Sequence, residues 1–536
     1  MSTEDHESRG RALLRHGSTL SVLTLFSRVL GLAREMTKAA FLGTSALSDA
    51  FSVAFMIPNL FRRLFAEGSI AVAFIPTFKE YLLENEQGSK ENIKEFLSCV
   101  LTFLSFFVTL TVMAGIIFCP LIIRFFGLEE FNETVFLTRL MFPFLVFISL
   151  AAFFQGILNS LRIFAPSGMA PILLNVITIS CTFILSPHLK NPARAMAAGI
   201  LIGGFMEAAI QLPFILAHKS KMRFFFTGLK KAIDNPGTRK VLRLIAPTVI
   251  GMAAYQLNDL VSTALAGNAG AGVVSSLQYS LRLQELILGI FAVSIGTVLL
   301  PDLAEYAKLN QWDIYNQRLV SAMNIIALIT IPITFFSLAQ GESLIILLFR
   351  TRSFDEESVK LTLEAFTFHM PGLYFIALNR ILAPAFYAQS NSKSPAIAGI
   401  ISFGVNMVLA ALLVSRYKGA GIALALSIAS AFNTAALLVF LKKNPEIKVG
   451  ATVKSTLLYA FKIMLFSGVA VIPVLVLSPA LKQLFAGRNR IMSEGLPLFI
   501  NALFFIGAGI LLLAITRDRQ FTGILKMIKK RSRSAP

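Results

Sequence analysis

The sequence predicts an all-α polytopic membrane protein, and its composition, span lengths and charge content support this class. Hydrophobic residues make up 55% of the 536 residues, and the mean hydropathy is +0.72. Only 15% of the residues are charged, whereas soluble domains average about 25%. Many stretches exceed the ~18 apolar residues that a helix needs to cross about 30 Å of hydrocarbon.

We expect about fourteen transmembrane helices. Span two is too long for one straight crossing, so we expect Pro58 to kink it and its C-terminal part to protrude into the cytoplasm. The spans lie near 19–43, 47–83, 95–119, 133–160, 168–187, 193–217, 240–266, 273–300, 320–340, 360–388, 395–415, 419–441, 455–478 and 494–516.

The first twelve spans read as two copies of a six-helix unit. AVAFIPTFKEY (71–81) matches IGTVLLPDLAEY (295–306), and Phe142-Pro143 matches Met370-Pro371 further along. A unit with an even number of spans gives two lobes of the same orientation, related by a pseudo-twofold axis along the membrane normal. The predicted parts are a cytoplasmic N-terminus (1–18), an N-lobe (19–217), a basic linker (218–239), a C-lobe (240–441), two extra helices (442–516) and a basic tail (517–536).

The net charge of +20 is explained by cytoplasmic loops, where basic residues accumulate, rather than by nucleic acid. The linker and the tail are basic, while acids such as Glu129, Glu130 and Asp355 lie in loops on the opposite side. Both termini are therefore expected in the cytoplasm, with anionic lipid head groups as partners. The polar first 17 residues do not resemble a cleavable signal peptide.

Spans one and two carry an unusual concentration of charge for membrane helices. A charge at the bilayer centre costs roughly 3 kcal/mol on insertion scales, so these side chains must face one another, a wet cavity or an anionic cargo. Glu67 is placed to pair with Arg63, four residues away, and Glu35 or Lys38 is expected to snorkel to the outer interface. The charged candidates are Arg28, Arg34, Asp49, Arg62, Arg63 and Glu67.

Span eight adds Arg282, which would face the same cavity if the lobes are pseudosymmetric. Surplus arginine suits a phosphate-bearing cargo, because the guanidinium fork binds phosphate oxygens in a bidentate way. The alternative is a closed network of Arg and acid that only holds the helices together. Asp259 in span seven is a candidate for sodium or proton coupling, or else a hydrogen-bonded core carboxyl.

Catalytic motifs are absent from the sequence, as are the cysteine and histidine spacings of a metal centre. The chain therefore reads as a transporter without a cofactor, and not as an enzyme. Because the sequence has no phosphate-binding loop for ATP, transport would draw on an ion gradient or on the membrane potential.

Five segments resemble the MviN/MurJ family of bacterial lipid II flippases, in the multidrug/oligosaccharidyl-lipid/polysaccharide exporter superfamily. They are FSRVLGLARE (26–35), SDAFSVAF (48–55), PNLFRRLFAEGS (58–69), AFIPTFKEY (73–81) and APAFYAQSNSKSP (383–395). The resemblance implies that lipid II, the undecaprenyl-pyrophosphate-linked disaccharide-pentapeptide, moves from the inner to the outer leaflet of the bacterial inner membrane by alternating access, for peptidoglycan synthesis.

The resemblance also implies residue roles. Arg28, Arg34, Arg62, Arg63 and Arg282, with Glu67 beside them, would line the substrate cavity, and Asp49 would gate the outward side. Spans 13 and 14 would form a groove for the lipid tail. Asp259 would supply one ligand of a sodium site, but spans eleven and twelve offer only Asn406, Ser427 and Asn433. The membrane potential acting on the arginines is therefore an alternative driving force.

Three other functions stay open from the sequence. One is a flippase for a different lipid-linked oligosaccharide. Another is a membrane enzyme, such as a polymerase or ligase of lipid-linked glycans. The last is a scaffold that binds the cell-wall synthesis machinery without transporting anything.

Overall fold

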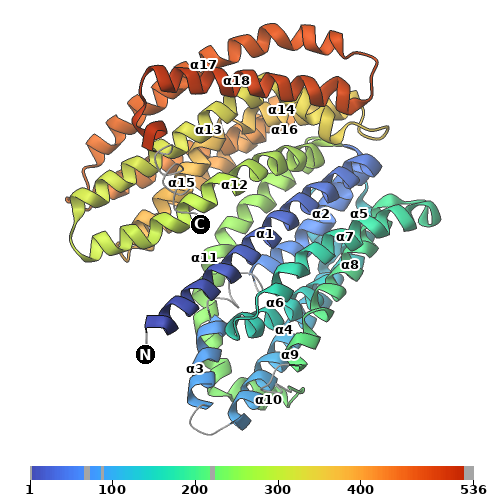
Figure 1. Cartoon of the computed structure of the whole chain (residues 1–536). Coiled ribbons are helices and arrows are strands. Elements are labelled where there is room, and N and C mark those ends of the chain that lie inside the picture. Colours follow the sequence, from blue (N-terminus) through green and yellow to red (C-terminus); the bar gives the residue numbers. More distant parts are fainter. Residues whose placement is uncertain (1–2, 65–72, 86–89, 218–223, 524–536) are drawn as a thin grey trace. The chain divides into compact units, whose positions relative to one another are not determined.

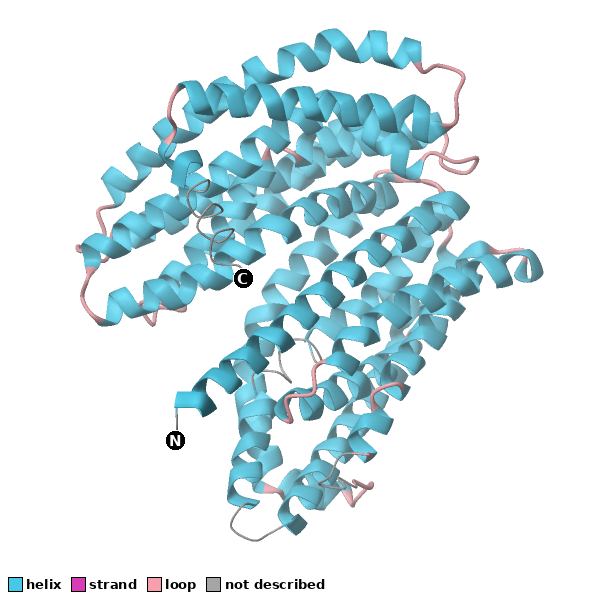
Figure 2. Ribbon diagram, in the orientation of Figure 1, coloured by secondary structure: helices cyan, strands magenta, loops and turns pink. Residues whose placement is uncertain are grey.

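The computed structural model describes residues 3–64, 73–85, 90–217 and 224–523 (Figure 1). These residues form helices joined by short loops, with no β-strand among them (Figure 2). The chain divides into two compact units, Met1–Ser275 and Ser276–Pro536. The expected all-α class is confirmed, whereas the lobe boundaries near 217 and 240 stay a prediction.

Unit 1 contains eleven helices among its described residues, several of which are paired halves of one span. Within it α1 packs on α7, α2 packs on α5, and α8 packs on both α6 and α7. The helices are α1 (Thr3–Leu42), α2 (Ala46–Arg62), α3 (Ile75–Asn85), α4 (Lys90–Arg124), α5 (Phe131–Met141), α6 (Phe144–Ser160), α7 (Ala165–Leu189), α8 (Pro192–Ala209), α9 (Leu212–Leu216), α10 (Leu229–Asp234) and α11 (Pro236–Gly267).

Unit 2 is built around α13 and α16. The helix α13 packs on α17 and α15, and α16 packs on α14 and α15. The helices are α12 (Val273–Lys308), whose first turn falls in unit 1, α13 (Trp312–Phe349), α14 (Glu356–His369), α15 (Gly372–Tyr387), α16 (Lys393–Leu441), α17 (Val449–Leu484), a π-helical turn (Ile491–Gly495) and α18 (Leu496–Ile515).

The helices agree with a polytopic membrane protein. Eight spans in the described residues are long and apolar enough to cross a membrane, and the pair α14–α15, bent by 48°, makes a ninth. The helix α16 supplies two spans, because Lys418 has a non-helical φ of 46° and ψ of −128°. Four further helices are not among those spans, namely α1, α2, α11 and α12, which are 40, 17, 32 and 36 residues long. The expected count of fourteen is therefore approximate.

Several helix starts follow directly from capping residues in the sequence. Asn191 accepts hydrogen bonds from the backbone N–H groups of Ala193 and Arg194, and Pro192 occupies the first helical position of α8. Asn235 and Pro236 begin α11 in the same way. A side-chain acceptor followed by proline suits a helix start, because proline has no N–H that would need a partner there.

Proline breaks occur at equivalent places in the two halves. Pro143 separates α5 from α6, and Pro371 separates α14 from α15, as the matched motifs predict. The expectation of one kinked helix over 47–83 is tested only in part. The helix α2 continues through Pro58 to Arg62 and α3 begins at Ile75, and residues 65–72 lie outside the described part.

The last two long helices are fastened to α13 by both apolar and polar contacts. Ala470, Val474 and Phe505 form one apolar cluster between them. Asn501 of α18, fully buried, donates to Gln340 of α13 at 3.2 Å. In a membrane, such polar side chains hold helices together because lipid offers them no partner.

Asp518 anchors the segment that follows α18. Its carboxylate is 3% exposed and accepts hydrogen bonds from Lys462 Nζ (2.7 Å) and Tyr459 Oη (3.0 Å), both on α17. The backbone N–H groups of Gln520 and Phe521 also donate to it. This arrangement ties the chain after α18 back onto α17.

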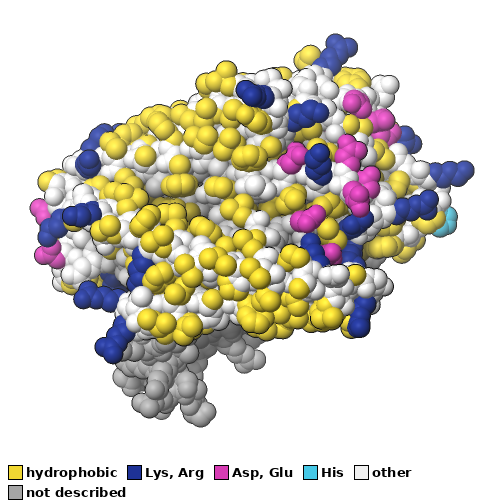
Figure 3. Space-filling view, turned by 90° about the horizontal axis from the view of Figure 1, so that it is seen from above, with side chains coloured by type: hydrophobic (Ala, Val, Ile, Leu, Met, Phe, Trp, Pro, Cys, Tyr) yellow, Lys and Arg dark blue, Asp and Glu magenta, His cyan; other side chains and the backbone are white. Residues whose placement is uncertain are grey.

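Charged and apolar side chains are separated on the face seen in Figure 3. Hydrophobic side chains cover its middle, and lysine, arginine and acidic side chains gather toward its ends. Large exposed apolar residues are frequent on α17 and α18, for example Val476 at 70% and Leu511 at 60% exposed. Such surfaces are what lipid-facing helices present.

We predict that Asp518→Asn lowers the thermal denaturation midpoint of the detergent-solubilised protein. Burial raises the pKa of this carboxyl, but the hydrogen bonds from Lys462, Phe521 and Tyr459 outweigh burial and lower the pKa overall. The stabilisation is therefore complete above the ordinary aspartate pKa of about 3.9 and is lost as the pH falls through the lower folded-state value.

The matched control is Asp313→Asn, which removes an ion pair with Lys448 where the side chains are 66% and 79% exposed. It should leave the midpoint nearly unchanged, because exposed pairs are screened by water. Equal effects of the two substitutions, or a stability gap for Asp518→Asn that persists well below pH ~3.9, would contradict the anchoring role.

Candidate functional site: buried charges of helices α1 and α2

The helices α1 and α2 form a hairpin whose charged residues range from partly exposed to almost fully buried. The turn between them is short because Gly43 takes a φ of 57°, and Ser45 then caps α2 through the backbone N–H of Ser48. A left-handed residue that ends one helix beside a cap that starts the next makes a tight connection. The short turn thus determines which charged residues of α1 and α2 lie at the same level along the two helix axes.

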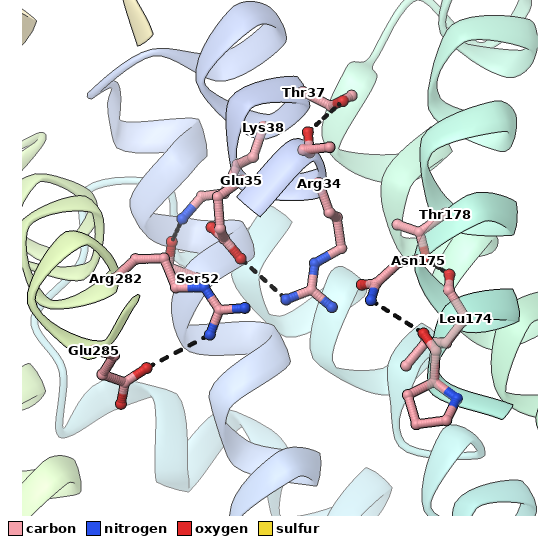
Figure 4. Close-up of polar contacts among 12 residues, drawn as sticks. Arg34, Glu35, Thr37, Lys38, Ser52, Leu174, Asn175, Thr178, Arg282 and Glu285 are labelled. Atoms are coloured by element: carbon pink, nitrogen blue, oxygen red, sulfur yellow. Dashed lines mark hydrogen bonds and ion pairs between the residues drawn. The ribbon is translucent and has the colours of Figure 1, made fainter. Parts of the chain in front are cut away.

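On α1, Arg34 is paired and Arg28 is not. The Nη2 atom of Arg34 lies 3.0 Å from Glu35 Oε1 (Figure 4). The Arg34 guanidinium also lies over the Phe55 ring, 5.5 Å from its centroid. Arg28 is half-buried, and among the described residues no ion pair joins it to an acid. Asn175 of α7 lies beside this part of α1, since its Nδ2 donates to the carbonyl of Ser27 at 3.4 Å.

Lys38 differs from the expectation that Glu35 or Lys38 reaches the outer interface by snorkelling. Lys38 is only 3% exposed, and its Nζ donates to Ser52 Oγ of α2 at 2.5 Å (Figure 4). Ser52 in turn donates to the carbonyl of Ser48. Because the Ser52 hydroxyl on α2 accepts a hydrogen bond from Lys38, the ammonium is held between the two helices rather than at the outer interface.

Asp49 is 2% exposed, and its two oxygens are bound by backbone groups at the start of α12. The N–H of Gly272 donates to Oδ2 and the N–H of Ser275 donates to Oδ1, both at 2.7 Å. These N–H groups have no partners within the first turn of the helix, and the helix dipole favours an anion there. Asp49 therefore joins α2 to the connection between α11 and α12.

Arg62 and Arg63 end α2 and have different partners. Arg62 Nε donates to Asn59 Oδ1 at 2.7 Å, whereas Arg63 Nη1 lies 3.4 Å from Asp259 Oδ2 on α11. The expected pairing of Arg63 with Glu67 is not tested, because Glu67 lies outside the described residues. No spacing in the sequence indicates the Arg63–Asp259 pair, because its members are 196 positions apart.

Arg282 belongs to unit 2 and interacts locally. Its Nη1 lies 3.5 Å from Glu285 Oε2, one turn along α12, with side chains 33% and 54% exposed. Exposed pairs of this spacing contribute little to stability. The guanidinium is thus held only loosely and is available to another anion.

Three glycines let loops pack closely at the end of unit 1 where the hairpin turns, which we call the turn end (residues 43–45, 125–130 and 268–272). A Cβ on Gly272 would lie 2.3 Å from the carbonyl oxygen of Thr44, and one on Gly267 would lie 2.2 Å from that of Phe126. Gly127, with a φ of 59°, similarly faces the Asn268 side chain. The connection between α11 and α12 is therefore wedged between the other two loops.

The charge balance of the described residues favours an anion. The cationic side chains are Arg28, Arg34, Lys38, Arg62 and Arg63, and the acids that face them are Glu35, Asp49 and Asp259. Cations thus exceed acids within membrane-length helices. Among the described residues no group of three His, Cys, Asp or Glu side chains is placed to hold a metal ion.

Comparisons with known proteins agree on one family. The family model described as lipid II flippase MurJ matches residues 38–489. A curated relative from Treponema pallidum (strain Nichols), a probable lipid II flippase MurJ, is 46% identical over 97% of this chain and 98% of its own.

Solved structures give the same result for the fold. The chain matches a lipid II flippase MurJ in an inward closed conformation with a TM-score of 0.75 and 26% identity, over 93% of this chain and 98% of the other. A multidrug transporter of the MATE family, in the MOP superfamily, matches with a TM-score of 0.65 and 15% identity, over 81% and 96% of the two chains. The second match concerns the fold alone.

We predict that Gly272→Ala opens the turn end. The substitution combines crowding against Thr44 with an unfavourable φ of 81°, so it should cost roughly 1–3 kcal/mol. The readout is the rate at which a hydrophilic thiol reagent modifies Ser48→Cys in a background without Cys99, Cys119 and Cys181. Ser48 is fully buried and its hydroxyl has no hydrogen bond, so the reporter removes none.

Substitutions at two other glycines test crowding of the Cβ and the unfavourable φ separately. Gly270→Ala meets open space at a φ of 124°, and Gly267→Ala meets the Phe126 carbonyl without a positive φ. We expect faster labelling for Gly272→Ala and Gly267→Ala, with Gly270→Ala close to the parent protein. Equal labelling of all three variants would show that close packing does not keep the turn end shut.

Proposed function

Because the chain belongs to the MurJ family of lipid II flippases, we propose that it moves lipid II from the inner to the outer leaflet of the bacterial cytoplasmic membrane. The observation that carries the proposal is the surplus of cationic side chains on α1 and α2, inside a multi-pass membrane protein. Lipid II presents a pyrophosphate between an undecaprenyl tail and a disaccharide-pentapeptide. A dianionic group of this kind is a suitable cargo for helices that carry more arginine than acid.

Arg28, Arg34, Arg62 and Arg63 are the proposed pyrophosphate ligands of the hairpin. Arginine binds phosphate oxygens through two parallel N–H donors, and such charge-assisted bonds are about twice as strong as neutral ones. Arg34 and Arg63 already interact with Glu35 and Asp259, at 3.0 and 3.4 Å. We propose that they hold the helices and exchange partners when cargo arrives. Arg282 on α12 is proposed as a further pyrophosphate ligand, and Glu67 is proposed to balance the charge of the hairpin arginines.

Transport is proposed to proceed by alternating access. The head group would cross between states that open to one side and then to the other, while the undecaprenyl tail stays in lipid along α17 and α18. Asp49 would act as the gate at the turn end, since its carboxylate holds α2 to the start of α12. Releasing these two bonds would open that side.

The orientation and partners follow from loop charge. We propose that both termini and the basic segment around Lys230, Lys231 and Lys240 face the cytoplasm, where anionic lipid head groups attract them. The turn end would then face the outside. Enzymes of cell-wall synthesis, which consume lipid II there, are the proposed functional partners.

The membrane potential is the proposed driving force. Asp259, the candidate sodium ligand, lies beside Arg63, which already supplies a positive charge. One elementary charge moved through 100 mV is worth roughly 2.3 kcal/mol, so a few mobile arginines suffice. We predict that proteoliposomes translocate lipid II under a potassium diffusion potential without sodium. A requirement for a sodium gradient that Asp259→Asn removes would contradict this.

We predict that Arg28→Ala, Arg62→Ala and Arg282→Ala each abolish growth in cells depleted of the native protein, although each variant still inserts. Loss of one buried charge-assisted contact to phosphate is expected to cost about 1.5–3 kcal/mol, and pyrophosphate needs several such contacts. The direct readout is the exposure of lipid II on the outer leaflet, measured by accessibility to an added probe.

A matched control is Arg239→Ala, because Arg239 pairs with Asp234 at exposed positions (60% and 53%) away from the hairpin. This variant should support growth. Normal lipid II exposure in depleted cells would instead favour another lipid-linked oligosaccharide as cargo, or a scaffold. Full activity of an Arg28, Arg62 and Arg282 triple alanine variant would rule out the arginine site.

A further inference from the structure

Lys38 is a buried cation that neither the arginine site nor the family comparison explains. Its side chain is 3% exposed and lies inside the α1–α2 hairpin, with Nζ 2.5 Å from Ser52 Oγ (Figure 4). A lysine in the interior of membrane helices is expensive and tends to mark a functional position. The nearby carboxylates of Glu35 and Asp49 also interact with its positive charge, so Lys38 belongs to the same group of charges as Asp49.

The hydrogen bond to Ser52 places the Lys38 ammonium close to Asp49. Asp49 and Ser52 lie three residues apart on α2 and share one helix face. Since Lys38 is bonded to Ser52, its ammonium lies about one helical turn from the Asp49 carboxylate, and the two charges interact. Asp49 does not need the lysine in this conformation, because both of its oxygens already accept backbone N–H groups.

Asp49 loses these two hydrogen bonds when the turn end opens. The two N–H donors belong to Gly272 and Ser275, so moving the start of α12 away from α2 removes both at once. A buried carboxylate without a partner is strongly destabilising. Lys38 stays nearby in any such movement, because the turn Gly43–Ser45 and the bond to Ser52 hold α1 against α2.

We propose that Lys38 is the alternative partner of Asp49, a positioning residue that binds the carboxylate when the start of α12 leaves it. The inference rests on the proposed alternating-access function. In the closed state the Asp49 carboxylate accepts backbone N–H groups, and in the open state it pairs with the Lys38 ammonium. The carboxylate therefore has a partner in both states. The flexible four-carbon stem and three donors of lysine suit a change of partner within one helical turn.

Other nearby charges are less suited to this role. Arg34 is occupied by Glu35 and lies over the Phe55 ring, which restrains its guanidinium. Arg62 and Arg63 lie at the far end of α2, more than three helical turns from Asp49. Lys38 is therefore the cation whose position follows Asp49 in both states.

The test uses thiol labelling of Ser48→Cys from the outside of vesicles, together with lipid II translocation. Lys38→Met keeps the length of the stem and removes the charge. We expect it to slow labelling and translocation by about tenfold or more, because the open state loses the partner of a buried charge. Lys38→Arg should retain most of both. The matched control, Lys360→Met at an exposed position of α14, should leave both unchanged.

A double-mutant cycle separates this role from a purely structural one. In an Asp49→Asn background the carboxylate is gone, so Lys38→Met should have little further effect on labelling. An undiminished effect there would overturn the proposal, as would wild-type labelling in Lys38→Met. Lys38→Arg behaving like Lys38→Met would also overturn it, since charge would not be what matters.

The same experiment distinguishes failure of the inference from failure of the proposed function. If the wild-type protein does not translocate lipid II but the labelling cycle behaves as expected, the cargo assignment is wrong and Lys38 still partners Asp49. If the wild type translocates lipid II and the labelling cycle is additive, the cargo assignment stands and the partnership is wrong.

Discussion

The cost of holding ionised side chains in a membrane governs how unit 1 is built. Asp49 illustrates it best, because a nearly fully buried carboxylate is accommodated by two backbone N–H groups, each 2.7 Å away. That single arrangement joins α2 to the start of α12 and requires the connection before α12 to lie close to the hairpin turn. Glycine at 272 is then needed, because any side chain would strike Thr44.

The remaining charges follow the same constraint in different ways. Arg34 is compensated by its sequence neighbour Glu35 and by an aromatic face, whereas Arg63 is compensated by Asp259 on a different helix. Arg28 has no acid partner in the described part of the chain. A protein that needed only stability would replace such residues with apolar ones. Their presence suits a mobile anionic cargo that supplies the missing negative charge during each transport cycle.

The sequence predicted the positions of the helices well, but it predicted the contacts of the charged side chains poorly. Apolar run length identifies membrane spans, and Asn-Pro pairs mark the starts of α8 and α11, because these signals are local. The break at Lys418 agrees with two expected spans within α16. Asp259 is brought to Arg63 by packing, which helical spacing does not predict, and the expected pair of Arg63 with Glu67 stays a prediction because Glu67 lies outside the described residues. The sequence predicted Glu35 or Lys38 at the outer interface and did not indicate Ser52 as an acceptor for Lys38, because that contact depends on how the two helices of the hairpin pack.

The central claim is that surplus arginine recognises the pyrophosphate of a lipid carrier. The most direct measurement is competition for the binding of fluorescent lipid II to the purified protein, using undecaprenyl pyrophosphate and undecaprenol, which differ only in the pyrophosphate. The account predicts that undecaprenyl pyrophosphate displaces lipid II and that undecaprenol does not. Equal competition by the two lipids would show that the tail, and not the charge, determines binding, and would contradict the account.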